Sequence, residues 1–181
     1  MYITVPDEKI NLIKSIIPRL EEISNTKIEL NERTKSINVT PLNNNAYDAM
    51  KVISIIKAIG VGFDPEDAMK LMKDDYILEI IDLKDVSNGP DDLKRIKGRI
   101  IGEKGKTKKI IQEYTGVNII ITDHYVGILG NVEQADIAKR AIEMLIKGRE
   151  HSTVYKYLDR AERDLYLFKI NRALKEGLNN T

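Results

Sequence analysis

The pattern of hydrophobic and polar positions between Tyr76 and Gly148 changes several times, and each change predicts a new element. "YILEIIDL" (76–83) is apolar and β-rich, which is typical of a strand. In "DLKRIKGRII" and "KTKKIIQEYTG", apolar residues recur at helical spacing on both sides of a short glycine-containing stretch. "VNIIITDHYVGILGN" (117–131) predicts two strands joined near Asp123, and "VEQADIAKRAIEMLIKG" predicts an amphipathic helix. The predicted order is therefore β-α-α-β-β-α.

The first part of the chain carries a weaker copy of the same pattern. "SNTKIEL" (24–30) parallels "TGVNIII" (115–121) at an offset of 91 residues. "VGFDPEDAMKLM" (61–72) lies opposite "KGREHSTVYKYL" (147–158) at an offset of 86. Because these matches come in the same order along the chain, they indicate a tandem duplication of a unit of about 86 residues. We expect one unit over residues 1–75 and a second over residues 76–181.

The two copies differ where the second one has its glycine stretch. Nine residues lie between Ile10 and Leu20, whereas fourteen lie between Ile96 and Ile111, so the first copy lacks five residues and all glycines there. Pro18 predicts a break or a first turn between two helices. We therefore expect residues 1–75 to form a degenerate unit that serves as a structural or protein-binding partner.

The residues after Gly148 predict a C-terminal helix. Ser152 or Thr153 is the expected N-cap, because a side-chain hydroxyl there accepts a bond from a free backbone N–H. The apolar side expected for this helix consists of Tyr155, Leu158, Leu165 and Phe168. We expect that side to pack against either unit, and the last residues, 174–181, to be frayed.

Charge is distributed unevenly. The whole chain has a net charge of +1, yet the segment 94–109 contains one acid, Glu103, and eight basic residues, a net +7. The basic residues are Lys94, Arg95, Lys97, Arg99, Lys104, Lys106, Lys108 and Lys109. Residues 1–75 carry ten basic and twelve acidic side chains, a net −2. Such a run is often only a solvated helix face, but its position around a glycine stretch favours binding of a polyanion.

The stretch "IIGEKGKTKK" (100–109) raises the question of a nucleotide-binding P-loop, since Gly105-Lys106-Thr107 is how such a loop ends. A P-loop needs G-x-x-x-x-G-K-[ST] after a buried strand, and the position five before Gly105 is Ile100. A basic, helical pattern precedes the stretch. An NTPase is therefore disfavoured. Glycines between two helices instead allow a tight turn that a sugar-phosphate backbone can approach, and lysines there favour phosphate.

This element order, with "IIGEKG" between the helices and "TGVNI" after them, resembles the type I (eukaryotic type) KH domain with its I-G-x-x-G loop. "RIKGRIIGEKGKTKKIIQEYTGV", "ILG" and "KGREHSTVYKYL" resemble the archaeal members of the partner-of-Nob, or Dim-two, family of ribosome-assembly proteins. The resemblance implies an α+β fold of two tandem type I KH domains, the first degenerate, plus a C-terminal helix. Lys108 departs from the KH pattern, which usually has an apolar residue there.

The resemblance and the basic segment together imply single-stranded RNA as the ligand. The expected RNA-binding residues are Lys97, Arg99, Ile100, Ile101, Gly102, Glu103, Lys104, Gly105, Lys106, Thr107, Lys108, Lys109, Ile119 and Ile121. The four isoleucines would form an apolar platform for bases, although some must serve the core. Ile119 and Ile121 share one face of their strand, and sequence does not say whether that face is the groove. By resemblance, the target is the 3′ region of small-subunit ribosomal RNA. The implied partners are the Nob endonuclease and the alpha subunit of initiation factor two.

Composition limits the chemistry. With 42% apolar and 31% charged residues the chain is ordinary globular material, and without Cys it has no disulfide or thiolate site. Two histidines and no diagnostic spacing of acidic or nucleophilic groups predict no metal, no cofactor and no enzyme activity. No apolar run is long enough for a membrane span, and a cytoplasmic location fits best. A protein-interaction scaffold whose basic loop binds acidic partners is the alternative.

Overall fold

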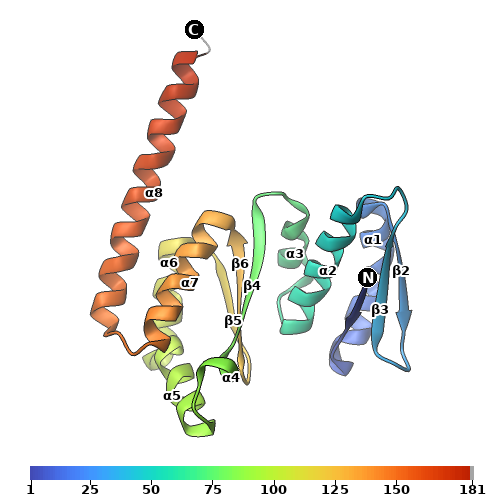
Figure 1. Ribbon diagram of the computed structural model, residues 1–181, viewed down its shortest axis with the longest axis horizontal. Coiled ribbons are helices and arrows are strands. Elements are labelled where there is room, and N and C mark those ends of the chain that lie inside the picture. Colours follow the sequence, from blue (N-terminus) through green and yellow to red (C-terminus); the bar gives the residue numbers. More distant parts are fainter. Residues whose placement is uncertain (180–181) are drawn as a thin grey trace.

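Two three-stranded antiparallel sheets organise the chain, and helices lie between and beside them (Figure 1). The computed structural model describes residues 1–179. The strand orders, β1-β3-β2 and β4-β6-β5, are the same in both halves. The expected α+β class, with two related units and a C-terminal helix, is confirmed.

The first half has the order β-α-β-β-α, followed by two short helical turns. Its elements are β1 (Tyr2–Thr4), η1 (Asp7–Lys9), α1 (Ile10–Ser24), β2 (Thr26–Asn31), β3 (Ser36–Pro41), α2 (Ala46–Val61), α3 (Pro65–Ala68) and η2 (Met69–Met72). One helix, α1, stands where the second half has two, in agreement with the five missing residues. The predicted break at Pro18 is wrong, because α1 runs through it. Pro18 lies on the exposed face, where water can satisfy the Lys14 carbonyl that loses its helical partner.

The second half has the predicted order β-α-α-β-β-α. Its elements are β4 (Tyr76–Asp82), α4 (Leu83–Val86), α5 (Pro90–Ile101), η3 (Glu103–Gly105), α6 (Lys106–Thr115), β5 (Asn118–Ile121), β6 (Tyr125–Asn131), α7 (Val132–Ile146) and α8 (His151–Asn179). Gly116, at a φ of 71°, ends α6 as its position in the sequence predicts. Strand β5 lies at the edge of the sheet and pairs with β6. Its outer side faces α6, because the Ile119 N–H donates to Gln112 Oε1 of that helix.

The second sheet is covered on both faces. Helices α5 to α7 pack on one face, and α2 and η2 of the first half pack on the other (Figure 1). A Cβ atom on Gly127 of β6 would lie 2.8 Å from the Phe63 ring, so the first half presses directly on the strand backbone. Leu129 accordingly belongs to the hydrophobic cluster of the first half. The boundary between residues 75 and 76 stays a proposal, because this cluster includes residues from both sides of it.

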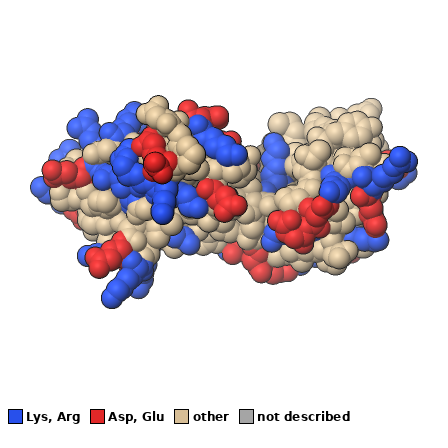
Figure 2. Space-filling view, turned by 90° about the horizontal axis from the view of Figure 1, so that it is seen from below, with Lys and Arg blue, Asp and Glu red and all other residues tan. Residues whose placement is uncertain are grey.

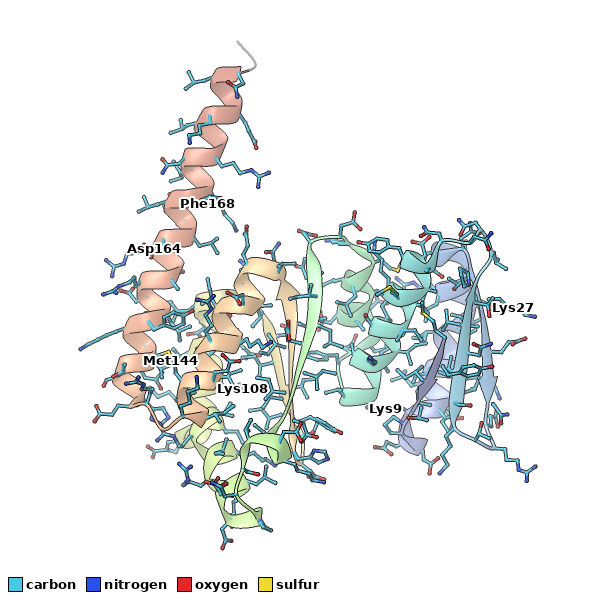
Figure 3. All side chains as sticks on the ribbon, viewed as in Figure 1. Lys9, Lys27, Lys108, Met144, Asp164 and Phe168 are labelled. Carbon is cyan, nitrogen blue, oxygen red and sulfur yellow. The ribbon has the colours of Figure 1, made fainter. Side chains whose placement is uncertain are left out.

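Helix α8 packs through its first turns and then projects away from the rest of the chain (Figures 1 and 3). Val154 and Leu158 are fully buried against α6 and α7, whereas Phe168 is 55% exposed, because the helix has passed the ends of its neighbours. The predicted N-cap is wrong: the Glu150 carbonyl already accepts the Val154 N–H, so the helix begins at His151.

The helix continues to Asn179 instead of fraying after residue 174, and residues 180 and 181 of the expected second unit lie outside the described residues. Between residues 1 and 179, no helix has both the length and the apolar character that a membrane span requires.

Candidate nucleic-acid interface

The loop between α5 and α6 has a backbone that only glycine adopts at its first position. Gly102 has φ 75° and ψ 172°, and Gly105 has φ 76°. Lys104 between them also has a positive φ, of 52°. A Cβ on Gly102 would lie 2.2 Å from Thr107 Oγ1, whereas one on Gly105 would meet nothing within 4 Å. The loop thus joins two helices tightly and does not follow a strand, so it lacks the setting of a P-loop.

Helix α8 and the turn before it hold the loop from behind. Thr107 is only 2% exposed, and its Oγ1 lies 3.0 Å from the Tyr155 hydroxyl. Arg99 Nε donates to the Leu145 carbonyl at 3.1 Å, and Arg99 Nη2 donates to the Arg149 carbonyl. His151 Nε2 lies 3.0 Å from the Arg99 carbonyl, which can only accept, so this nitrogen carries the proton. Arg99 and Thr107, both expected to bind RNA, therefore fix the loop to the C-terminal helix.

Two of the four platform isoleucines belong to the core. Ile100 is fully buried and Ile119 is 2% exposed, so neither side chain can meet a base. Ile100 lies one turn after the buried Ile96 on α5, and Ile119 faces the helices from β5. Ile101 and Ile121 are half-buried and remain as the apolar part of the surface. Ile120 points to the other face of the sheet, toward the first half.

Lys97 and Lys108 flank the loop and face the edge strand. Lys97 Nζ on α5 donates to the Asp123 carbonyl at the tip of the β5–β6 hairpin, at 3.3 Å. Lys108 is half-buried and lies one turn before Gln112, whose Oε1 accepts the β5 Ile119 N–H at 2.9 Å. The side of α6 that carries Lys108 therefore turns toward the sheet (Figure 3). The Lys108 side chain, which stands where an apolar residue is usual, is therefore half-buried and has no ion-pair partner among residues 1–179.

These residues define one surface, which we call the loop face. It consists of Lys97, Ile101, Gly102, Glu103, Lys104, Gly105, Lys108 and Ile121. Its lysines come from α5, the loop and α6, and its two isoleucines come from α5 and β5. Lys106 and Lys109 lie next to it on α6 and are exposed.

The cations near the loop are largely free of carboxylates. Among residues 1–179, no ion pair involves Lys94, Lys104, Lys106 or Lys108, and the Lys109–Glu113 pair is long at 3.9 Å. In the first half the basic residues that pair with a carboxylate are Lys14, Arg19, Lys27, Lys35, Lys51 and Lys70. Figure 2, which views the molecule from below, shows Lys and Arg gathered over the second half. Lys94, Lys104, Lys106 and Lys108 are therefore available to an anionic ligand, whereas Arg95 pairs with Asp92 at 2.7 Å.

A histidine–aspartate pair at the hairpin tip was not predicted. His124 Nδ1 donates to Asp82 Oδ1 at 2.9 Å, and its ring centre lies 4.0 Å from that of Tyr125. The His124 hydrogen bond, with the Lys84 backbone N–H, holds the pKa of Asp82 below its usual value. Asp82 also caps α4, so the pair joins the tip of the β5–β6 hairpin to the end of β4. The Asp at the end of a strand, before a short helix, was a possible signal for it.

The part of the chain that the structure describes contains no group of three or more His, Cys, Asp or Glu side chains placed to hold a metal ion. The side chains of the loop face are three lysines, two isoleucines and the Glu103 carboxylate.

Comparison with known proteins agrees with this geometry. Residues 77–163 match the family model described as the eukaryotic type KH-domain, KH-domain type I. The crystal structure of Dim2p from Pyrococcus horikoshii matches with a TM-score of 0.77 and 36% identity, over 88% of this chain and 98% of that one. The chain belongs to the partner-of-Nob, or Dim2, family of KH-domain proteins.

Other proteins are similar over most of the chain. A KH domain-containing protein of Methanocaldococcus jannaschii is 37% identical over 85% of this chain and 66% of its own length. The pre-rRNA-processing protein PNO1 of Debaryomyces hansenii is 34% identical over 84% of this chain and 63% of its own length. A chain of the a/eIF2alpha–aDim2p–rRNA complex from Pyrococcus horikoshii matches with a TM-score of 0.77 and 35% identity, over 91% and 94% of the two chains. The chain thus spans about two thirds, or slightly less, of these curated relatives.

Proposed function

We propose that this chain binds single-stranded RNA through the loop face and carries out no catalysis. The observation that carries the proposal is a tight glycine loop surrounded by lysines that lack carboxylate partners. A backbone without side chains at Gly102 and Gly105 lets a sugar-phosphate chain come close, and free cations release counterions when phosphates replace them. Surface lysines that are already paired, as in the first half, offer less of this attraction.

The residues of the loop face take different roles in this proposal. Lys104 in the loop and the neighbouring Lys106 contact phosphates, and Lys97 and Lys108 line the path of the strand. Ile101 and Ile121 contact the faces of unpaired bases. A KH loop of this kind holds about four nucleotides. Duplex RNA is excluded in this mode because paired bases cannot turn toward the isoleucines.

The identity of the RNA is inferred from the relatives. Since a relative is named a pre-rRNA-processing protein and a solved neighbour belongs to a complex with rRNA, we take ribosomal RNA as the ligand class. The finer proposal is the 3′ region of small-subunit rRNA during ribosome assembly in the cytoplasm. The proposed partners are the Nob endonuclease, which would act on the RNA held here, and the alpha subunit of initiation factor two. The second partner is supported by the a/eIF2alpha component of the same complex.

Competition between single-stranded and duplex RNA, measured at several salt concentrations, tests this function. We expect the single strand to bind more tightly. With about two to four phosphate contacts, the logarithm of affinity should fall against that of salt with a slope of roughly −1.5 to −3. Equal binding of duplex, or a much steeper slope, would show an unspecific polyanion clamp.

The alternative functions are outcomes of the same assay. Displacement of RNA by an acidic peptide at equal affinity would favour a protein-interaction scaffold. Tight binding of ATP or GTP with magnesium, lost in Lys106→Ala, would restore the nucleotide-binding hypothesis.

A further inference from the structure

A hollow of about 460 Å³ lies beside the glycine loop, and we call it the flank pocket. Its walls come from α5, the loop and the start of α8, and include Arg95, Lys106, His151 and Tyr155. Arg95 and Lys97 are two residues apart on α5, so they point to opposite sides of that helix. The flank pocket therefore shares Gly102 and Glu103 with the loop face and extends from it on the side of α5 that faces away from Lys97.

The walls of the flank pocket are cationic. Arg95, Arg99 and Lys106 line it, against one lining carboxylate, Glu103. Arg99 is held by two backbone carbonyls, which fix its position without neutralising its charge. Among residues 1–179, Lys106 has no ion-pair partner, and the Arg95–Asp92 pair is exposed enough to exchange for another anion. A phosphate group is the anion that a fork of guanidinium groups suits best.

A strip of bare backbone connects the flank pocket with the loop face. Gly98 is exposed on α5, and a Cβ there would meet nothing within 4 Å. Gly102, one turn later, caps α5. No side chain at Gly98 stands between Arg95 on one side of α5 and Lys97 on the other. An extended nucleic-acid backbone can therefore cross α5 here and contact both surfaces at once.

We propose that the flank pocket is a second phosphate-binding site, which takes backbone phosphates of the same RNA strand next to the nucleotides at the loop face. The inference rests on the proposed RNA binding and extends it from about four nucleotides to a longer segment. The start of α8, through His151 and Tyr155, thereby forms part of the RNA-binding surface as well as the support of the loop.

The test compares two RNAs on the full chain at about 0.15 M salt. The first is the tightest-binding tetranucleotide selected from a random pool, and the second is the same tetranucleotide with three uridines added at each end. We expect the longer RNA to bind about fourfold more tightly for each additional phosphate that the protein binds. Arg95→Gln should remove about fourfold of that increase and leave the affinity for the tetranucleotide within about twofold.

Arg33→Gln is the matched control, because Arg33 is an exposed arginine of the first half that does not line the flank pocket. Circular dichroism melting checks that both variants fold. Equal losses of affinity for the longer RNA in the two variants would overturn the inference. It would also be overturned if hexaglutamate displaced the longer RNA from the wild type but failed to displace it from Arg95→Gln. If the tetranucleotide binds and the extension adds nothing, the flank pocket fails alone. If neither RNA binds, the proposed function fails with it.

Discussion

Tyr155 on α8 and Thr107 at the start of α6 share a hydrogen bond of 3.0 Å between their hydroxyl groups, across 48 residues of sequence. Thr107 is buried directly beneath Gly102, so this bond connects the C-terminal helix to the first glycine of the loop. A buried hydroxyl without a partner is costly, and the pair therefore fixes the loop in one conformation.

Tyr155→Phe should lower the free energy of unfolding by about 1 kcal/mol, because Thr107 Oγ1 loses its side-chain partner. We also expect weaker binding of single-stranded RNA, since the loop is less firmly held. Tyr157→Phe is the control, because the Tyr157 hydroxyl makes no hydrogen bond within residues 1–179. Chemical denaturation and RNA titration of both variants check the prediction. If both variants lost stability and RNA affinity equally, the hydrogen bond between Tyr155 and Thr107 would not be what holds the loop.

The two loop glycines should respond differently to alanine. Gly102→Ala introduces a Cβ within 2.2 Å of Thr107 Oγ1 and 2.6 Å of the Thr107 backbone nitrogen, and we expect a loss of about 3 kcal/mol or more in stability. Gly105→Ala has open space and only a left-handed backbone to maintain, which costs about 1 kcal/mol. Urea denaturation of the two variants measures this difference. Similar losses would show that contact with Thr107 is unimportant.

An added carboxylate in the loop should weaken RNA binding without unfolding the chain. In the double variant Glu103→Asp, Lys104→Asp, the positive φ of residue 104 is retained because Asp adopts it more readily than most residues. We expect a loss of RNA affinity of about tenfold or more, since one phosphate contact is replaced by repulsion. Lys57→Asp changes an exposed cation of the first half and serves as control. Unchanged RNA affinity in the loop variant would remove the loop from the binding surface.

The contact between the two halves should make them unfold together. Phe63→Ala removes the ring that packs on Gly127 and should cost about 3 to 5 kcal/mol, with a single melting transition for the whole chain. Leu42→Ala, at a side chain 64% exposed, should have almost no effect. Scanning calorimetry that resolves two transitions in the wild type would contradict this prediction.

Acid should weaken the hairpin tip. The hydrogen bond from His124 lowers the pKa of Asp82 in the folded state. The ionised Asp82 therefore contributes its full stabilisation above the usual carboxyl pKa of about 3.9. This stabilisation is lost as the pH falls through the lower pKa of the folded state. Asp82→Asn should be less stable at neutral pH and should lose less stability below pH 4. Melting temperatures between pH 2 and 7 measure this, with Asp85→Asn in α4, the short helix that Asp82 caps, as control. If the melting temperatures of wild type and Asp82→Asn fell equally below pH 4, the proposed contribution of the Asp82 carboxylate to stability would be contradicted.

Local pattern was sufficient for the second half of the fold. The apolar, β-rich run of β4, the helical spacing in α5 and the glycines of the loop are each local in sequence, and the predicted elements agree with the structure. The prediction of a break at Pro18 was wrong because the proline is exposed. Water can replace the backbone hydrogen bond that it removes, so the helix continues through it. The absence of the glycine loop from the first half could be predicted because the segment between Ile10 and Leu20 is five residues shorter than its counterpart between Ile96 and Ile111.

Burial at the site could not be predicted in the same way. Ile100 and Ile101 are adjacent and chemically identical, and only the packing of α5 on the sheet decides that the first is core and the second is surface. The anchoring of Arg99 and Thr107 by α8 depends on contacts about 50 residues away in sequence. Gly127 was a usable signal, because a glycine inside a strand often marks a close approach by another part of the chain.

The covering of the second sheet on both faces has a thermodynamic consequence for binding. Because α2 and η2 support one side and α5 to α7 the other, β5 and the loop beside it have little freedom to lose when a ligand arrives. Most of the conformational entropy lost on binding is therefore lost by the flexible RNA strand. Heat capacity changes on binding should accordingly be small and reflect only the apolar surface that the bases cover, with no contribution from folding of the protein.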